Sequence, residues 1–178
     1  MRYRRAFIPG GSFFFTLVTH KRRKLFADGN NIDVLRQAFR RVKEKRPFDI
    51  EAIAILPDHL HCIWTLEPKD ADFSTRWRLI KTWFSKYCSA DLRVSPDRAG
   101  QRKNQQAIWQ HRFWEHVLRD ETDFMRHVDY IHYNPVKHGY VDAPIKWRYS
   151  SFHRYVHAGV HAADWGTGTI DLEGIGHE

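Results

Sequence analysis

The sequence predicts an α+β domain, in which an antiparallel sheet carries two helices on one face. Two observations support this: strand-like runs at residues 12–19, 48–56 and 59–66, and apolar residues at helical spacing in residues 34–42 and 73–87. The connections between these segments are short and rich in turn residues. A chain of 178 residues is long enough for one domain with a sizeable core.

The first half of the chain gives the first four elements. Residues 12–19 (SFFFTLVT) are aromatic and β-branched, which predicts a strand. A turn at residues 28–31 precedes a helix that Pro47 ends. Residues 48–56 (FDIEAIAIL) become fully apolar, as in a central strand, and a Pro57-Asp58 turn leads into the next strand as a hairpin.

That next strand places two histidines on one face. Alternate side chains of a strand point the same way, so His59 and His61 share the wetter face. Leu60, Cys62 and Trp64 take the core face. Two adjacent imidazoles are half of a metal site, although surface histidines in a histidine-rich chain would give the same pattern.

The second half of the chain adds a helix at residues 73–87, a polar linker at 90–106 and an extended segment at 108–118. A further helix begins near Asp120 and is expected to end at about Tyr133, because the residue before Pro135 resists helical geometry. The predicted order is β-α-β-β-α-β-α. Its first six elements have the ferredoxin-like order βαββαβ, and the last helix is an addition.

The last predicted helix carries a tyrosine beside an amide. Tyr130 and Asn134 lie one turn and about 40° apart, next to His127. They lie off the apolar stripe formed by Phe124, Val128 and Ile131. A tyrosine that only packs against the body is the alternative interpretation.

The charge of the chain favours a polyanionic partner. Lys and Arg number 29 against 21 acids, and residues 159–178 contain no Lys or Arg and four acids, so residues 1–158 carry +12. A merely basic soluble protein is the alternative. We expect residues 1–158 to form the functional domain and residues 159–178 a flexible acidic tail. There is no apolar run of membrane-spanning length, and we expect no secretory signal and a reducing cytoplasm.

Several motifs together resemble the REP-associated tyrosine transposases, of the single-tyrosine HUH (IS200-like) superfamily. HUH denotes two histidines that flank one apolar residue on a strand. The matching stretches are residues 3–5 with 10–16, Leu56-Pro57-Asp58-His59-Leu60-His61, Arg112-Phe113-Trp114-Glu115-His116, residues 129–137 (DYIHYNPVK), and Trp147 with Ser150-Ser151. An H-x-H pair alone is a weak signal. An LP-x-H-x-H strand followed about 70 residues later by YI-x-x-NPVK is specific.

The resemblance implies a site and a reaction. His59, His61 and Asn134 would bind a divalent metal, Mg²⁺ or Mn²⁺, and the helix of Tyr130 would be a catalytic tyrosine helix. Tyr130 would attack single-stranded DNA to give a 5′-phosphotyrosine and a free 3′-OH, with no nucleotide cofactor. The metal, His127 or His132 could activate the phenol, which ordinarily has a pKa of about 10.

The resemblance also implies the partner. Short palindromic repeat hairpins with an adjacent single strand are expected, and their phosphates would meet basic side chains, with Arg4, Arg5, Arg22 and Arg23 as candidates. A monomer or homodimer in a bacterial cytoplasm, associated with the nucleoid when DNA is bound, is expected. The alternatives are a non-catalytic nucleic-acid-binding ferredoxin-like protein and a metal-dependent nuclease that uses water.

Overall fold

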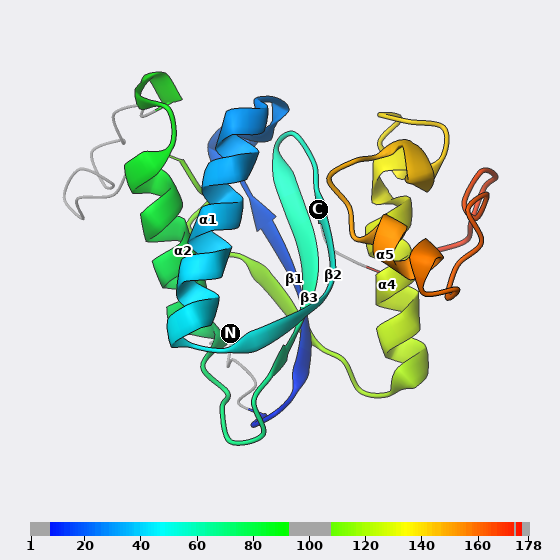
Figure 1. The fold of residues 1–178 in the computed structure, drawn as a ribbon, viewed down its shortest axis with the longest axis horizontal. Coiled ribbons are helices and arrows are strands. Elements are labelled where there is room, and N and C mark those ends of the chain that lie inside the picture. Colours follow the sequence, from blue (N-terminus) through cyan, green and yellow to red (C-terminus); the bar gives the residue numbers. More distant parts are fainter. Residues whose placement is uncertain (1–7, 93–107, 173, 176–178) are drawn as a thin grey trace.

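A four-stranded antiparallel sheet forms the centre of the protein. The computed structural model describes residues 8–92, 108–172 and 174–175. The strands are β1 (Ser12–Val18), β2 (Phe48–Ile55), β3 (His59–Leu66) and β4 (Trp114–Val117), in the order β2-β3-β1-β4. The three strands predicted in the first half of the chain are confirmed, and β4 is shorter than the predicted segment 108–118. Figure 1 shows α1 and α2 on one side of this sheet and α4 with α5 on the other.

Two helices cover the first face of the sheet. They are α1 (Gly29–Lys45) and α2 (Phe73–Tyr87), and the side chains of Asp28 and Asp72 cap their N-termini. Alternate residues of β1 and β3 point toward them, and Trp64 of β3 stacks on Trp77 of α2 with ring centroids 4.0 Å apart. This larger core holds β3 and β1 in place.

The second face of the sheet is covered by α4 (Glu121–Lys137) and the short α5 (Phe152–His157). The expectation that the helix ends before Pro135 is wrong, because α4 continues to Lys137. A proline so near a helix end removes only one intrahelical hydrogen bond. The His138 amide still donates to the Asn134 carbonyl at 3.0 Å, and Tyr140 to Pro135 at 3.0 Å.

The segment after α4 extends the free edge of the sheet at β2. Ser151 donates its amide to Ile53 at 2.8 Å, and Ile55 donates its amide to Tyr149 at 2.9 Å. The segment from Tyr149 to Ser151 therefore packs along β2. Short 3-10 helices complete the described chain, at His20–Arg22, Leu25–Ala27, Ala90–Leu92 and Pro144–Lys146.

The acidic segment after residue 158 packs against the α4 side of the sheet over much of its described length. His161 stacks on Trp165 at 4.5 Å, and its Nε2 lies 3.1 Å from Asp129 of α4. Ile175 is 8% exposed and joins the apolar cluster between α4 and the sheet. The domain boundary at residue 158 stays a prediction. Most of the linker predicted at residues 90–106 lies outside the described residues.

Among the residues that the structure describes, none of the helices has both the length and the apolar character needed to span a membrane.

Candidate functional site

The two histidines of β3 are held by the protein through the same ring atom. His59 donates Nδ1–H to Asp58 Oδ1 at 2.6 Å, because a carboxylate can only accept. His61 Nδ1 lies 2.8 Å from the hydroxyl of Thr16, its directly paired neighbour on β1. With Nδ1 anchored on each ring, Nε2 is the nitrogen that could coordinate a metal. Such partners fix the tautomer and the orientation of a ligating imidazole.

Asp58 is itself fixed by the basic turn that follows β1. Arg22 Nη1 donates to Asp58 Oδ2 at 3.3 Å, and the Thr19 hydroxyl donates to the Asp58 carbonyl at 2.9 Å. Lys21 and Arg22 both have positive φ values, 53° and 51°, which non-glycine residues rarely adopt. Burial alone would raise the pKa of Asp58, but the contacts of His59 and Arg22 hold this pKa below its ordinary value.

Helix α4 brings the tyrosine to this pair. The Tyr130 ring lies 5.2 Å from the His61 ring in an edge-to-face arrangement, and both contact Phe14 of β1. Asn134 follows one turn later and is fully buried. His138, which directly follows α4, lies 5.0 Å from His59 between ring centroids. The turn of α4 that carries Tyr130 and Asn134 therefore lies over the strand that carries His59 and His61.

The site is more enclosed than the sequence predicts. The expectation that His59 and His61 lie on a wetter face is wrong: they are 1% and 0% exposed, because α4 covers that face of the sheet. Tyr130 is 1% exposed and belongs to the apolar cluster beneath α4.

Lys137 is a candidate site residue that the sequence did not predict. Its Nζ donates to the Tyr130 hydroxyl at 3.3 Å and lies 4.9 Å from the centre of the tyrosine ring. Positions seven apart share a helix face, so the signal was present in the sequence. It was lost because the helix was expected to end before Pro135.

Of the two histidines considered as activators of the tyrosine, neither has a described hydrogen bond to its hydroxyl. His132 Nε2 lies 2.9 Å from the hydroxyl of Ser151, on the segment that extends β2. Burial, and then the charges of His161 and Arg154, lower the pKa of His132 to about 3. His127 Nδ1–H donates to the backbone carbonyl of Asp123 at 2.8 Å.

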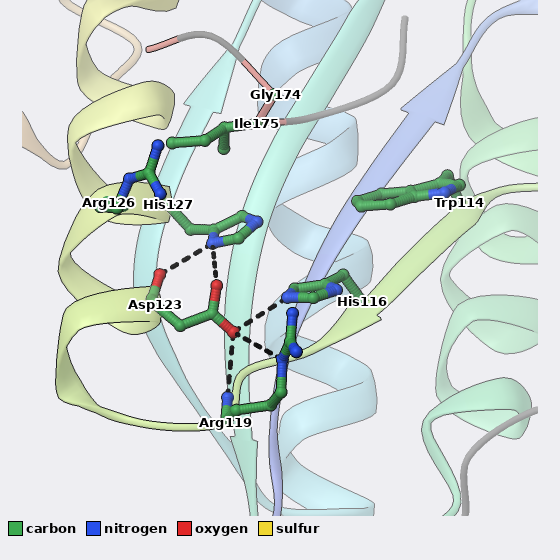
Figure 2. A pocket seen from close by; sticks show the side chains of 8 residues that line it. All are labelled: Trp114, His116, Arg119, Asp123, Arg126, His127, Gly174 and Ile175. Carbon is green, nitrogen blue, oxygen red and sulfur yellow. Dashed lines mark hydrogen bonds and ion pairs between the residues drawn. The ribbon is translucent and has the colours of Figure 1, made fainter. Parts of the chain in front are cut away.

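A second cluster lies on the same side of the sheet, between β4 and the start of α4. His116, Asp123 and His127 each offer one ligand atom, and these atoms lie within 4.8 Å of one another. In the described part of the chain, this is the one group of three His, Cys, Asp or Glu side chains placed to hold a metal ion. Figure 2 shows Asp123 between the two imidazoles.

Of the four arginines considered for DNA contact, two lie in the described part of the chain. Arg22 pairs with Asp58, and Arg23 donates to the Leu92 carbonyl at 2.7 Å. Both therefore support the turn after β1. Arg4 and Arg5 lie outside the described residues. A contact of any of these side chains with DNA stays a prediction.

Comparison with known proteins gives consistent matches. Residues 12–134 match the family described as "Transposase IS200 like". A REP-associated tyrosine transposase of Escherichia coli (strain K12) is 44% identical over 170 residues, which cover 96% of this chain and 93% of that protein. A protein of Haemophilus influenzae is 43% identical over 171 residues, with 96% of each chain covered.

A solved structure has the same fold. It is described as a REP-associated tyrosine transposase bound to a REP hairpin, and it is 41% identical with a TM-score of 0.80. The match covers 98% of this chain and 94% of that one.

Proposed function

Because this chain belongs to the IS200-like transposase family, as a REP-associated tyrosine transposase, we propose that it cleaves and rejoins single-stranded DNA through Tyr130. The tyrosine hydroxyl attacks a phosphodiester, its oxygen bonds to phosphorus, and the 3′-oxygen leaves to become a 3′-OH. The 5′-phosphotyrosine keeps the bond energy, so a second 3′-OH can reverse the attack. The observation that carries the proposal is the 5.2 Å approach of the Tyr130 ring to His61.

The proposed metal ligands are His59, His61 and Asn134. The donor set fits a divalent cation, since both imidazoles are oriented through Nδ1 and the amide is buried one helical turn beyond the tyrosine. A bound cation would polarise the scissile phosphate and stabilise the leaving 3′-oxygen. Nitrogen donors suit Mn²⁺ better than Mg²⁺, so Mn²⁺ should serve at least as well.

Lys137 is the proposed group that prepares Tyr130. An ammonium 3.3 Å from the phenol oxygen would stabilise negative charge that develops on this oxygen during the attack. The same contact holds the hydroxyl in one orientation before DNA enters. As DNA binds, the negative phosphate would compete with Tyr130 for this ammonium. Lys137 can then give up its hydrogen bond to the tyrosine and pair with the phosphate.

The proposed substrate is a short palindromic hairpin with an adjacent single strand, as a REP hairpin is bound in the related structure. The positive net charge supports a phosphate-rich partner. We also propose that the fold is ferredoxin-like, which the strand order β2-β3-β1-β4 and the two helices on one face support.

A denaturing gel of enzyme mixed with labelled hairpin DNA and Mn²⁺ tests the reaction. The wild type should form a labelled covalent adduct, and Tyr130→Phe should form none while its DNA affinity in a shift assay is unchanged. Tyr133→Phe, on the same helix, is the matched control and should still form the adduct. DNA cleavage without any adduct would indicate a water-using nuclease, and binding without cleavage a non-catalytic module. Either outcome would overturn the proposal.

A further inference from the structure

A pocket opens between β4 and α4, beside the proposed tyrosine site. It has a volume of about 200 Å³, and Figure 2 shows the side chains around it. The side chains that matter here are Trp114, His116, Arg119, Asp123, Arg126 and His127. Gly174 and Ile175 close one side of the pocket. The space is large enough for a phosphate group with part of its nucleotide, and too small for a bulky ligand.

The pocket and Tyr130 lie along the same face of α4. Asp123, His127 and Tyr130 are spaced by four and three residues, so they share one face of α4. Phe14 of β1 lies beneath both parts, with its ring 4.8 Å from His127 and 5.9 Å from Tyr130. A strand whose scissile phosphate reaches Tyr130 can therefore place a neighbouring phosphate in this pocket.

The carboxylate of Asp123 is already engaged by hydrogen bonds from neighbouring groups of the protein. His116 donates Nε2–H to Asp123 Oδ2 at 3.0 Å, and the Arg119 amide donates to the same oxygen at 3.0 Å. Burial would raise the pKa of Asp123, but these contacts hold it below its ordinary value, so the side chain is ionised at neutral pH. His127 Nδ1 lies 3.2 Å from Asp123 Oδ1, so the carboxylate contacts both imidazoles.

The remaining charge of the pocket is positive. Arg119 is largely exposed, with its Nε 3.7 Å from Asp123, and Arg126 projects from α4 on the other side of His127. Two guanidinium groups against one carboxylate favour an anion. The Trp114 indole, stacked parallel to His116 at 5.8 Å, offers an aromatic face to a nucleobase.

We propose that this pocket binds a backbone phosphate of the single-stranded DNA, next to the phosphate that is cleaved, through Arg119 and Arg126. The proposal rests on the proposed function, since it takes DNA as the ligand. His116 and His127 shape the floor of the pocket, and Trp114 stacks on the base of the same nucleotide. A metal ion held by His116, Asp123 and His127 is the competing occupant, which the two neighbouring arginines oppose by charge repulsion.

The test measures binding alone, in the Tyr130→Phe background, so that it does not depend on cleavage. The probes are oligothymidine and a DNA hairpin with a single-stranded extension. Arg119→Gln and Arg126→Gln should each weaken binding about tenfold at low salt, the loss of one charge-assisted contact. Each should also reduce the slope of log affinity against log salt by about 0.7, the value for one phosphate of a single strand.

The matched control is Arg78→Gln, which removes the same charge from an exposed position on α2, across the sheet from the pocket. It should leave the salt slope unchanged. A neutral methylphosphonate can replace one phosphate at a time along the single-stranded extension. At one linkage it should weaken DNA binding by the Tyr130→Phe protein, in which Arg126 is intact. At that same linkage it should cause no further loss of affinity once Arg126→Gln is added.

Salt slopes that match the Arg78→Gln control would overturn the phosphate pocket, while adduct formation by Tyr130 would still stand. Binding of a second equivalent of Mn²⁺ or Zn²⁺ that His127→Gln abolishes, with unchanged DNA affinity in both arginine variants, would assign the pocket to a metal instead.

Discussion

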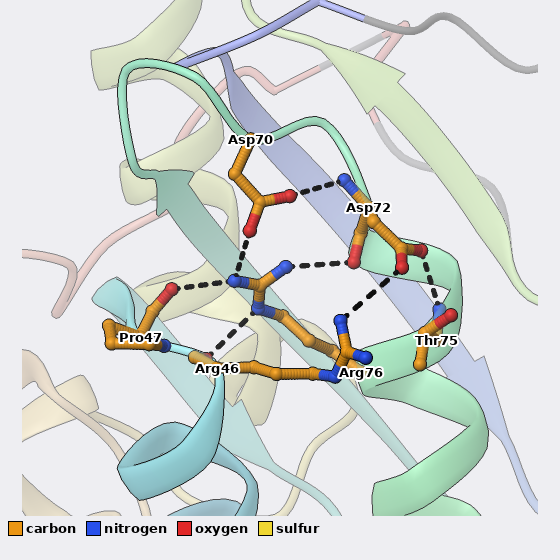
Figure 3. Close-up of polar contacts among 6 residues, drawn as sticks. All are labelled: Arg46, Pro47, Asp70, Asp72, Thr75 and Arg76. Atoms are coloured by element: carbon orange, nitrogen blue, oxygen red, sulfur yellow. Dashed lines mark hydrogen bonds and ion pairs between the residues drawn. The ribbon is translucent and has the colours of Figure 1, made fainter.

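Replacing Arg76 by methionine should destabilise the protein strongly, although the side chain is far from the proposed site. Arg76 lies at the start of α2 and its side chain is 1% exposed. Figure 3 shows its guanidinium between the α1–β2 connection and the loop before α2. It donates to the carbonyls of Arg46, Pro47 and Asp72 and to the carboxylate of Asp70, at 3.1, 2.8, 2.8 and 2.6 Å.

The expected loss can be worked from these contacts. Four hydrogen bonds at about 1 kcal/mol each would give roughly 4 kcal/mol. Methionine fills most of the space of the arginine stem, and water can reach the exposed residues Arg46 and Pro47, so about 3 kcal/mol should remain. For a chain of this size that corresponds to a fall of about 6–12 °C in Tm.

The hydrogen bond between Arg76 and Asp70 also makes the stability of the fold depend on pH. The hydrogen bond from Arg76 is the main cause that holds the pKa of Asp70 below its ordinary value. A depressed carboxyl pKa stabilises the fold above the pKa of the unfolded chain, about 4, and this contribution disappears as the pH falls through the folded value. The wild type should therefore lose stability below about pH 4 more steeply than Arg76→Met.

Urea unfolding at pH 7 and between pH 3 and 5, followed by tryptophan fluorescence, measures both effects. Arg78→Met is the matched control, because Arg78 lies on the same helix and is exposed. If the free energies of unfolding of Arg76→Met and Arg78→Met agree within about 1 kcal/mol, the reasoning from buried hydrogen bonds is refuted.

Two further predictions concern the proposed site and its support. Trp64→Ala removes a fully buried ring that stacks on Trp77, and it should lower the free energy of unfolding by about 3–5 kcal/mol while the folded fraction still cleaves DNA; a variant that unfolds like the wild type yet cannot cleave would contradict this. Asp58→Asn should weaken Mn²⁺ binding about 10–100-fold in a calorimetric titration, because the carboxylate orients His59. The control Asp28→Asn, at the cap of α1, should bind Mn²⁺ as the wild type does.

The sequence by itself determined what depends on local periodicity. The period of two places His59 and His61 on one face of β3, and the helical period places Tyr130 and Asn134 one turn apart. The same periods predicted the strands in the first half of the chain and both helices of the first layer. These features follow from backbone geometry within a few residues, so a single sequence carries them.

Only the tertiary structure decided what depends on pairing between distant segments. β1 lies between β3 and β4, which places Thr16 beside His61 and Phe14 opposite His116. Packing of α4 over that face buries both histidines, and the continuation of α4 past Pro135 brings Lys137 to Tyr130. The order of strands and the choice of the covered face are set by long-range burial, which no local pattern encodes.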